Sequence, residues 1–118
     1  YRYMTIQTTE HTQLTTLASL LHSLSDSTRL AIIRKLTENE ARVADLVDEL
    51  GLAQSTVSAH IACLKDCRLV EGRIEGRQTF YRLTSPDITH LLHDAEKILE
   101  QTDQAVANCP IFGGDREC

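Results

Sequence analysis

Two short helices joined by a glycine turn constrain the fold of this chain more than any other feature of its sequence. Apolar residues recur at helical spacing between Arg42 and Leu50, and Gly51 follows them as the left-handed residue that commonly ends a helix. Only Leu52 and Ala53 then precede a second stretch with helical spacing. A helix, a short glycine turn and a helix with a small, polar start form the helix-turn-helix pattern of DNA-binding proteins.

The second of these helices, which runs to Cys67, has two distinct faces. One face is an apolar stripe at i, i+4 and i+7 that is expected to meet the core: Val57, Ile61 and Leu64. Cys63 and Cys67 are four residues apart and therefore lie one above the other, about 100° around the helix from that stripe. Two thiols stacked one turn apart outside the core are able to share one metal ion.

The polar start of this helix and a basic hairpin after it are the predicted contacts with DNA. Small and polar side chains are expected to enter the major groove: Gln54, Ser55, Thr56, Ser58 and His60. The alternative for His60 is packing against the protein. Segments 68–74 and 77–83 are rich in β-forming residues and flank the tight-turn pair Glu75–Gly76. Arg73 and Arg77 lie near the tip of the resulting hairpin and are expected to contact phosphate.

The remaining segments complete a predicted order of α-α-α-α-β-β-α. Leucines at helical spacing indicate a first helix over residues 11–23, and an N-cap cluster starts a second over residues 26–37. Ser85 and Pro86 start a last helix, whose apolar stripe continues from Ile88 to about Ala105. A small winged core cannot cover such a stripe, so a second copy of the chain is its simplest partner. We therefore expect a mainly α fold with a small β-hairpin, a homodimeric winged helix-turn-helix.

Three regions are expected along the chain. Residues 1–10 are polar and expected to be disordered, and the three residues before Met4 are interpreted as an expression remnant. Residues 11–106 form the winged helix-turn-helix domain with its dimerisation helices. Residues 107–118 form an irregular tail that contains Cys109 and Cys118.

Charge and cysteine content narrow the class of protein. The net charge of −5 argues against a non-specific nucleic-acid coater, although residues 54–82 carry a net +2 and the rest of the chain −7. No apolar run approaches the roughly 20 residues that span a bilayer, and no secretory signal is visible, so we expect a cytoplasmic protein without a membrane partner. Four cysteines in a reducing compartment indicate metal binding or redox chemistry. No catalytic nucleophile with its base and no phosphate-binding glycine loop is visible, which predicts a protein that is not an enzyme.

Three motifs and the order of the elements resemble the ArsR/SmtB family of metal-responsive repressors. The motifs are LSDSTRL at residues 24–30, GLAQSTVSAH at 51–60 and EGRQ at 75–78, and the resemblance extends over about residues 17–108. Members of that family are winged-helix homodimers that block transcription until a metal ion releases them from the operator. The resemblance implies a dimeric repressor, and a two-fold dimer implies that its double-stranded operator DNA is an imperfect inverted repeat.

The cysteine pair resembles one branch of that family. Cys63 and Cys67 are similar to the pair of the CmtR-type branch, which senses cadmium and lead and takes a third thiolate from a cysteine after the last helix of the other subunit. Here that ligand is Cys109, with Cys118 as the alternative. The Cys-x-Cys that other branches carry in the third helix is absent, and the zinc site of the last helix is incomplete because Thr89 stands where a histidine is expected.

Three thiolates make a soft metal site. Such a site favours Cd(II) or Pb(II) as the inducer over hard cations, with Zn(II) as a further candidate. Arsenite also accepts three thiolates, and a thiol-redox switch could use the same cysteines, so an arsenite-responsive or redox-responsive repressor is the alternative. The cysteine spacing differs from the Cys-x-x-Cys of thiol-disulfide oxidoreductases, and no βαβ pattern surrounds it.

Overall fold

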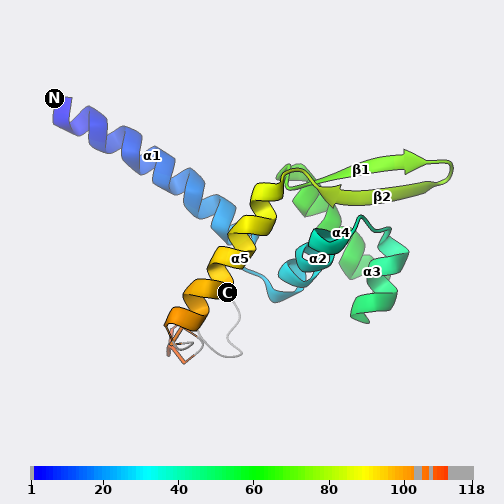
Figure 1. Ribbon diagram of the computed structural model, residues 1–118. Helices are drawn as coiled ribbons and strands as arrows, with labels where there is room; N and C mark the ends of the chain where they lie inside the picture. The colour runs from blue at the N-terminus through cyan, green and yellow to red at the C-terminus, as the bar shows by residue number, and fades with distance from the viewer. Residues whose placement is uncertain (1, 103–104, 107, 112–118) are drawn as a thin grey trace.

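The computed structural model describes residues 2–102, 105–106 and 108–111, with side chains described from residue 9 onward. Over these residues the element order is the predicted one, with four helices, a two-stranded antiparallel hairpin and a last helix (Figure 1). The elements are α1 (Arg2–Ser23), α2 (Ser27–Glu38), α3 (Val43–Leu50), α4 (Gln54–Asp66), β1 (Val70–Glu75), β2 (Gln78–Leu83) and α5 (Pro86–Gln101). Within the described part of the chain, no helix is both long and apolar enough to cross a membrane.

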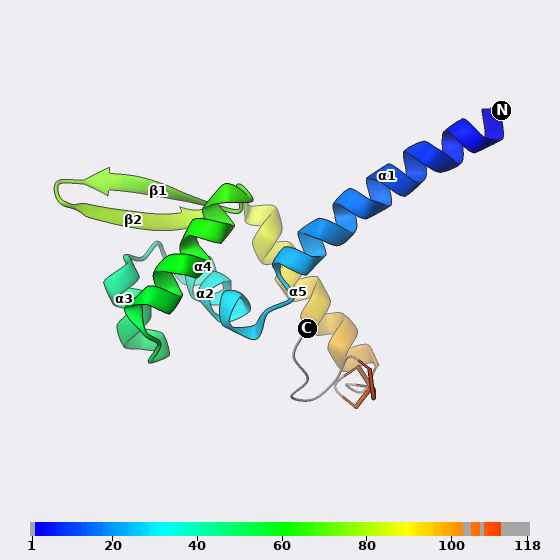
Figure 2. The same ribbon diagram turned by 180° about the vertical axis from the view of Figure 1, so that it is seen from behind.

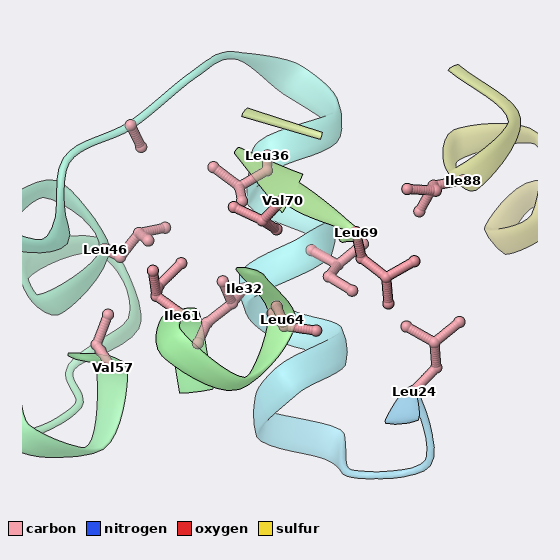
Figure 3. Packing of buried hydrophobic residues seen from close by; sticks show 12 residues of the cluster. Leu24, Ile32, Leu36, Leu46, Val57, Ile61, Leu64, Leu69, Val70 and Ile88 are labelled. Carbon is pink, nitrogen blue, oxygen red and sulfur yellow. The ribbon is translucent and has the colours of Figure 1, made fainter. Parts of the chain in front are cut away.

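The core lies between α2, α3, α4 and the start of the hairpin (Figure 3). Its fully covered side chains come from all four elements: Ile32, Ile33, Leu46, Val57, Leu64 and Val70. Each large aliphatic side chain buried in this way contributes about 1.5–3 kcal/mol to folding. The predicted stripe of α4 is confirmed, because Val57, Ile61 and Leu64 are all buried. This packing fixes the rotation of α4 and leaves its polar start and its thiols off the core.

The helix-turn-helix is confirmed as predicted. Gly51 adopts the left-handed conformation with φ of 66°, and its backbone N–H donates to the carbonyl of Val47 at 2.9 Å. A side chain at this φ would be strained, which explains the glycine. The turn brings α3 and α4 together. Only Leu52 and Ala53 lie between Gly51 and the first residue of α4.

The hairpin is the predicted wing. β1 pairs with β2 in antiparallel register from Val70 opposite Leu83 to Glu75 opposite Gln78. Gly76 supplies the positive φ of the turn, at 63°. Ala41, in the loop before α3, forms an isolated bridge to Tyr81 and so ties the base of the wing to the helix-turn-helix.

The first strand starts two residues later than predicted, because Arg68 ends α4 instead. Arg68 adopts a left-handed φ of 61°. The N–H of Arg68 donates to the carbonyl of Lys65 at 2.9 Å, and the N–H of Leu69 donates to that of Leu64 at 3.0 Å. This pair of bonds is the Schellman ending of a helix, in which glycine usually stands where this chain has arginine.

Two helix boundaries also differ from the prediction. α1 begins at Arg2 rather than near His11, so the expectation of disorder over residues 1–10 is wrong for residues 2–10; they contain no glycine or proline to stop a helix that has already formed. α5 ends at Gln101 rather than near Ala105. At this end the Thr102 hydroxyl donates to the carbonyls of Ile98 and Leu99, which are among the last carbonyls of the helix.

The molecule is elongated because α1 projects from the body on the side opposite the wing (Figure 1). The radius of gyration is 17.0 Å for 118 residues, whereas a compact domain of this length has about 13.5 Å. α1 has no extensive packing with any other described element. Its leucines remain exposed at the surface: Leu14, Leu17, Leu20 and Leu21.

Candidate functional site

The start of α4 forms a polar surface suited to a DNA groove. Gln54 and Ser55 are exposed, and Thr56 and Ser58 are half-buried beside the buried Val57. The exposed stripe of α4 continues through residues that the sequence prediction omitted: Ala59 and Ala62. These alanines lie one and two turns beyond Ser55 on the same face, so a duplex lying along α4 would meet small side chains for two turns.

His60 lies against the protein rather than on this exposed stripe. Its side chain is 25% exposed, and its Nε2 is 3.9 Å from Oδ2 of Asp26. Asp26 is the N-cap of α2 and accepts a hydrogen bond from the backbone N–H of Arg29 at 2.9 Å. Of the two interpretations of His60, packing is the one that this geometry supports.

The two wing arginines that were predicted to contact DNA have different surroundings. Arg73 forms ion pairs with Glu40 and, at 2.7 Å, with Glu75, and its guanidinium lies 5.0 Å from the centre of the Phe80 ring. The hydrogen bond between Arg73 and Glu40 lowers the pKa of the Glu40 carboxyl. The same bond makes the largest contribution to raising the pKa of Arg73. Arg77 is exposed next to the turn at Gly76. Arg77 is therefore the wing cation available to phosphate, whereas Arg73 holds the wing to the loop before α3.

The predicted thiol pair is present at the end of α4. Cys63 is half-buried and Cys67 is exposed, and neither is in a disulfide. Partial desolvation raises the pKa of the Cys67 thiol above its ordinary value of 9.0, and the charge of Cys63 and a hydrogen bond with it raise this pKa further. The two sulfurs are thus close enough to interact, which is what one shared metal ion requires. Figure 2 shows this end of α4 at the base of the hairpin, near the start of α5.

An arginine that the sequence prediction missed accompanies the thiols. Nη1 of Arg29 lies 4.0 Å from Sγ of Cys63, and Nη2 lies 3.5 Å from the carbonyl oxygen of His22. Arg29 is in the first turn of α2, 34 residues before Cys63, so no local pattern connects the two. The packing of α2 against α4 brings them together.

The tail cysteine is not beside the pair within one chain. Cys109 is half-buried and follows the far end of α5, a helix of 16 residues and so about 24 Å long. Within the described ranges, no group of three or more cysteine, histidine or carboxylate side chains is close enough to hold a metal ion. Cys118, the alternative third ligand, lies outside the described residues. In the incomplete zinc site of α5, Asp87 and His90 are exposed and 3.8 Å apart.

Comparison with known proteins agrees with this geometry. The family model described as "Bacterial regulatory protein, arsR family" matches residues 26–72. The transcriptional regulator CmtR of Mycobacterium bovis is 34% identical over 87 residues, which are 74% of each chain. The probable mercury resistance operon repressor of Streptomyces lividans is 29% identical over 102 residues, 86% of this chain and 82% of that protein.

A solved structure shares the fold. The homodimeric winged helix-turn-helix DNA-binding domain Mb0332 from Mycobacterium bovis superimposes with a TM-score of 0.70 and 27% sequence identity. The match covers 78% of this chain and 85% of that domain.

Proposed function

This chain belongs to the ArsR family of bacterial regulatory proteins, and from that membership we propose that it is a metal-sensing transcriptional repressor. It binds operator DNA as a homodimer, and a soft metal ion releases it. Cd(II) and Pb(II) are the favoured inducers. The site is Cys63 and Cys67 of one chain with Cys109 of a second copy.

The observation that carries this proposal is the position of the thiol pair on α4. The same helix presents its polar start to solvent and holds two interacting thiols at its other end. A metal ion that draws the pair toward a third thiol must act on the helix that reads DNA. The donor set fits a soft ion, because thiolates prefer large thiophilic metals to hard cations.

The exposed apolar surfaces of α1 and α5 support the dimer. Besides the α1 leucines, α5 exposes Leu91, Ile98 and Leu99. Between α2 and α5 lies an apolar hollow of about 820 Å³, lined by Leu30, Leu92 and Leu99 among others. Such surfaces on a regulator of this size are typical of an interface. A two-fold dimer presents two α4 helices to successive major grooves, roughly 34 Å apart.

A dimer also explains how Cys109 could join the thiol pair, from which it is separated within one chain. The tail cysteine lies beyond the far end of α5 from the pair in its own chain, so a second copy is the economical source of the third thiolate. The DNA contacts in this proposal are Gln54, Ser55, Thr56 and Ser58 in the groove and Arg77 on phosphate, with Arg73 and His60 holding the wing and α4 in place.

Binding of the ion changes operator affinity only through its different affinity for the two states of the protein. A coupling of about 1–3 kcal/mol per site weakens DNA binding several-fold to a hundredfold. By reciprocity, operator DNA weakens metal binding by the same factor. None of these steps requires bond-breaking chemistry by the protein, and we propose no catalytic role.

The experiment that tests this function is a titration of the reduced protein, bound to fluorescent DNA from upstream of its own gene, with Cd(II) and Pb(II). We expect release of the DNA together with an ultraviolet thiolate-to-metal absorption band. Cys63→Ser, Cys67→Ser and Cys109→Ser should keep DNA binding and lose the release, and Cys118→Ser should keep both. If Cys63→Ser responded at the same cadmium concentration as the parent, α4 would not carry the sensor.

The interaction of the two sulfurs also keeps the second candidate function, a thiol-redox repressor, open to test. Peroxide treatment in the presence of a metal chelator separates the two. Release of DNA by peroxide alone, without an effect of Cd(II), would favour the redox switch.

A further inference from the structure

We propose that Arg29 makes the thiol site selective for soft divalent ions over arsenite. This inference rests on the proposed metal site and adds a residue that determines which ion it prefers. Arg29 is on α2 and outside the set of sulfur ligands. Its effect is on the charge of the complex that the thiolates form.

The guanidinium of Arg29 is positioned beside the pair but is incompletely satisfied. Nη1 lies 4.0 Å from Sγ of Cys63, which is a long contact, and Nη2 reaches the carbonyl of His22 only at 3.5 Å. Nε is buried and has no hydrogen-bond partner among the described residues. Buried donors are nearly always paired in folded proteins, so the unpaired Nε is an exception that leaves this guanidinium with capacity for a further acceptor.

The positive charge of Arg29 also lacks a carboxylate. Among the described residues, no ion pair includes its side chain. The nearest acid along the chain is Asp26. Its Oδ2 accepts a hydrogen bond from the backbone N–H of Arg29 and also lies near Nε2 of His60. The guanidinium therefore faces the sulfur of Cys63 without a direct ion pair to any carboxylate among the described residues. A half-buried cation of this kind attracts negative charge more strongly than one in bulk water.

The candidate inducers differ in the charge of their complexes. A divalent ion that displaces the protons of three thiols releases three H⁺ and leaves a complex of charge −1. Arsenous acid, As(OH)₃, reacts with three thiols by forming three As–S bonds and releasing three waters, so its complex is neutral. Only the divalent complex gains from a fixed positive charge beside one of its sulfurs. Arg29 thus stabilises bound Cd(II) or Pb(II) and leaves bound arsenic nearly unaffected.

The guanidinium also supplies the contact through which this charge acts. Its N–H groups are fixed in a planar fork, and a hydrogen bond to an ionised acceptor is shorter and stronger than one to a neutral acceptor. The long contact between Nη1 and Cys63 should shorten when the sulfur becomes part of an anionic complex. A lysine at this position would keep the positive charge, but its compact ammonium group lacks the planar pair of N–H donors that the guanidinium offers to the sulfur.

The test compares the affinities of the full-length dimer for Cd(II) and arsenite in Arg29→Gln, Arg29→Lys and the parent. Cd(II) affinity is measured by competition with a chelator at the thiolate absorption band, and arsenite binding by the mass of the intact protein. In Arg29→Gln we expect Cd(II) affinity to fall about tenfold, with arsenite affinity within about twofold of the parent. Arg29→Lys should recover most of the Cd(II) affinity.

Arg34→Gln is the matched control, because it removes the same charge from an exposed position on the same helix. It should change neither affinity. If Arg29→Gln fails to fold, Arg29→Met serves as a second uncharged variant, because it keeps an apolar stem. If the uncharged variants lost affinity for Cd(II) and for arsenite by the same factor, Arg29 would have a structural role and the proposal would be overturned. Unchanged affinities for both would overturn it as well. If the parent bound neither ion, the proposed metal site itself would be wrong.

Discussion

Arg68 occupies a backbone conformation in which glycine is usual. Its φ of 61° completes the Schellman ending of α4, and the next residue, Leu69, is buried and donates its backbone N–H to the carbonyl of Leu64. A side chain in this region costs about 1–2 kcal/mol. Glycine removes that cost but loses more entropy on folding, by about 0.5–1 kcal/mol.

We expect Arg68→Gly to raise the free energy of unfolding by about 0.5–1 kcal/mol. Urea unfolding of the dimer at fixed protein concentration measures it. Arg68→Ala is the control, since it removes the same charge and stem but keeps the left-handed strain. A stabilisation by alanine equal to that by glycine would show that the side chain, and not the backbone, is responsible.

The thiol of Cys67 gives the proposed metal site a pH dependence with a definite sign. Its pKa lies above the ordinary 9.0, first because the thiol is partly desolvated and then because Cys63 is adjacent. The thiol is therefore protonated at neutral pH, and an incoming ion must displace the proton.

We expect the apparent Cd(II) affinity to rise continuously from pH 6 to pH 8.5, by about tenfold per pH unit for each protonated thiol displaced. Chelator competition at several pH values measures the slope. Cys67→Ser should reduce the slope by about one proton. A pH-independent affinity in the parent would contradict thiolate ligation by this residue.

At the residue scale, the sequence predicted neighbours within one helix and missed neighbours that come from different helices. Cys63 lies in α4 and Cys67 is the C-cap one turn later, and this neighbourhood follows from four-residue spacing alone. His60 and Arg29 could not be placed in this way. Their neighbours are set by the packing of α2 on α4, across 34 residues of sequence.

At the scale of the elements, two arginines of the wing have separate roles, one in attaching the wing and one in binding DNA. Arg73 is held by Glu40, Glu75 and the Phe80 ring, whereas Arg77 is exposed at the turn. A phosphate can recruit Arg77 without breaking an existing ion pair. Each phosphate contact releases counterions and so adds to the salt dependence of binding.

We expect Arg77→Ala to weaken all duplexes similarly and to reduce the slope of log K against log salt by about one per wing. Arg73→Ala should leave the slope nearly unchanged and instead increase hydrogen exchange in β1 and β2, because the wing loses its tie to Glu40. Fluorescence anisotropy over a range of salt concentrations measures both slopes. The assignment fails if the two variants change the slope equally.

The elements themselves were predictable wherever a strong local signal existed. The glycine turn at Gly51 and the proline at the start of α5 both stand where the sequence placed them. The errors fall at ends that depend on particular hydrogen bonds. Thr102 donates to carbonyls of the last turn at the end of α5, and Arg68 ends α4 in a conformation that its residue type does not favour.

At the scale of the whole molecule, the exposed leucines of α1 and the outer face of α5 are the surfaces that a second copy would cover. Leu17 is 49% exposed and Ile98 is 56% exposed. An aspartate in the middle of such an interface would have to be desolvated without a partner. The wing offers a matched control in Ile74, which is 77% exposed on β1, a strand without extensive packing against α1 or α5.

We expect Leu17→Asp and Ile98→Asp to weaken dimerisation at least tenfold and to lower the thermal unfolding temperature at micromolar protein, with Ile74→Asp dimerising as the parent does. Sedimentation equilibrium over a range of concentrations measures the association. Should the parent sediment as a monomer at micromolar concentration, with and without DNA, the dimer would be excluded.

The projection of α1 from its own body has a consequence for how repression depends on gene dosage. A helix that covers its leucines only against a second chain is complete only after two newly made chains have met. The supply of competent repressor then grows with the square of its synthesis rate while chains are scarce. A chain that remains alone keeps the α1 leucines exposed. We therefore expect operator occupancy to depend sharply on expression, because unpaired chains are the ones open to proteolysis.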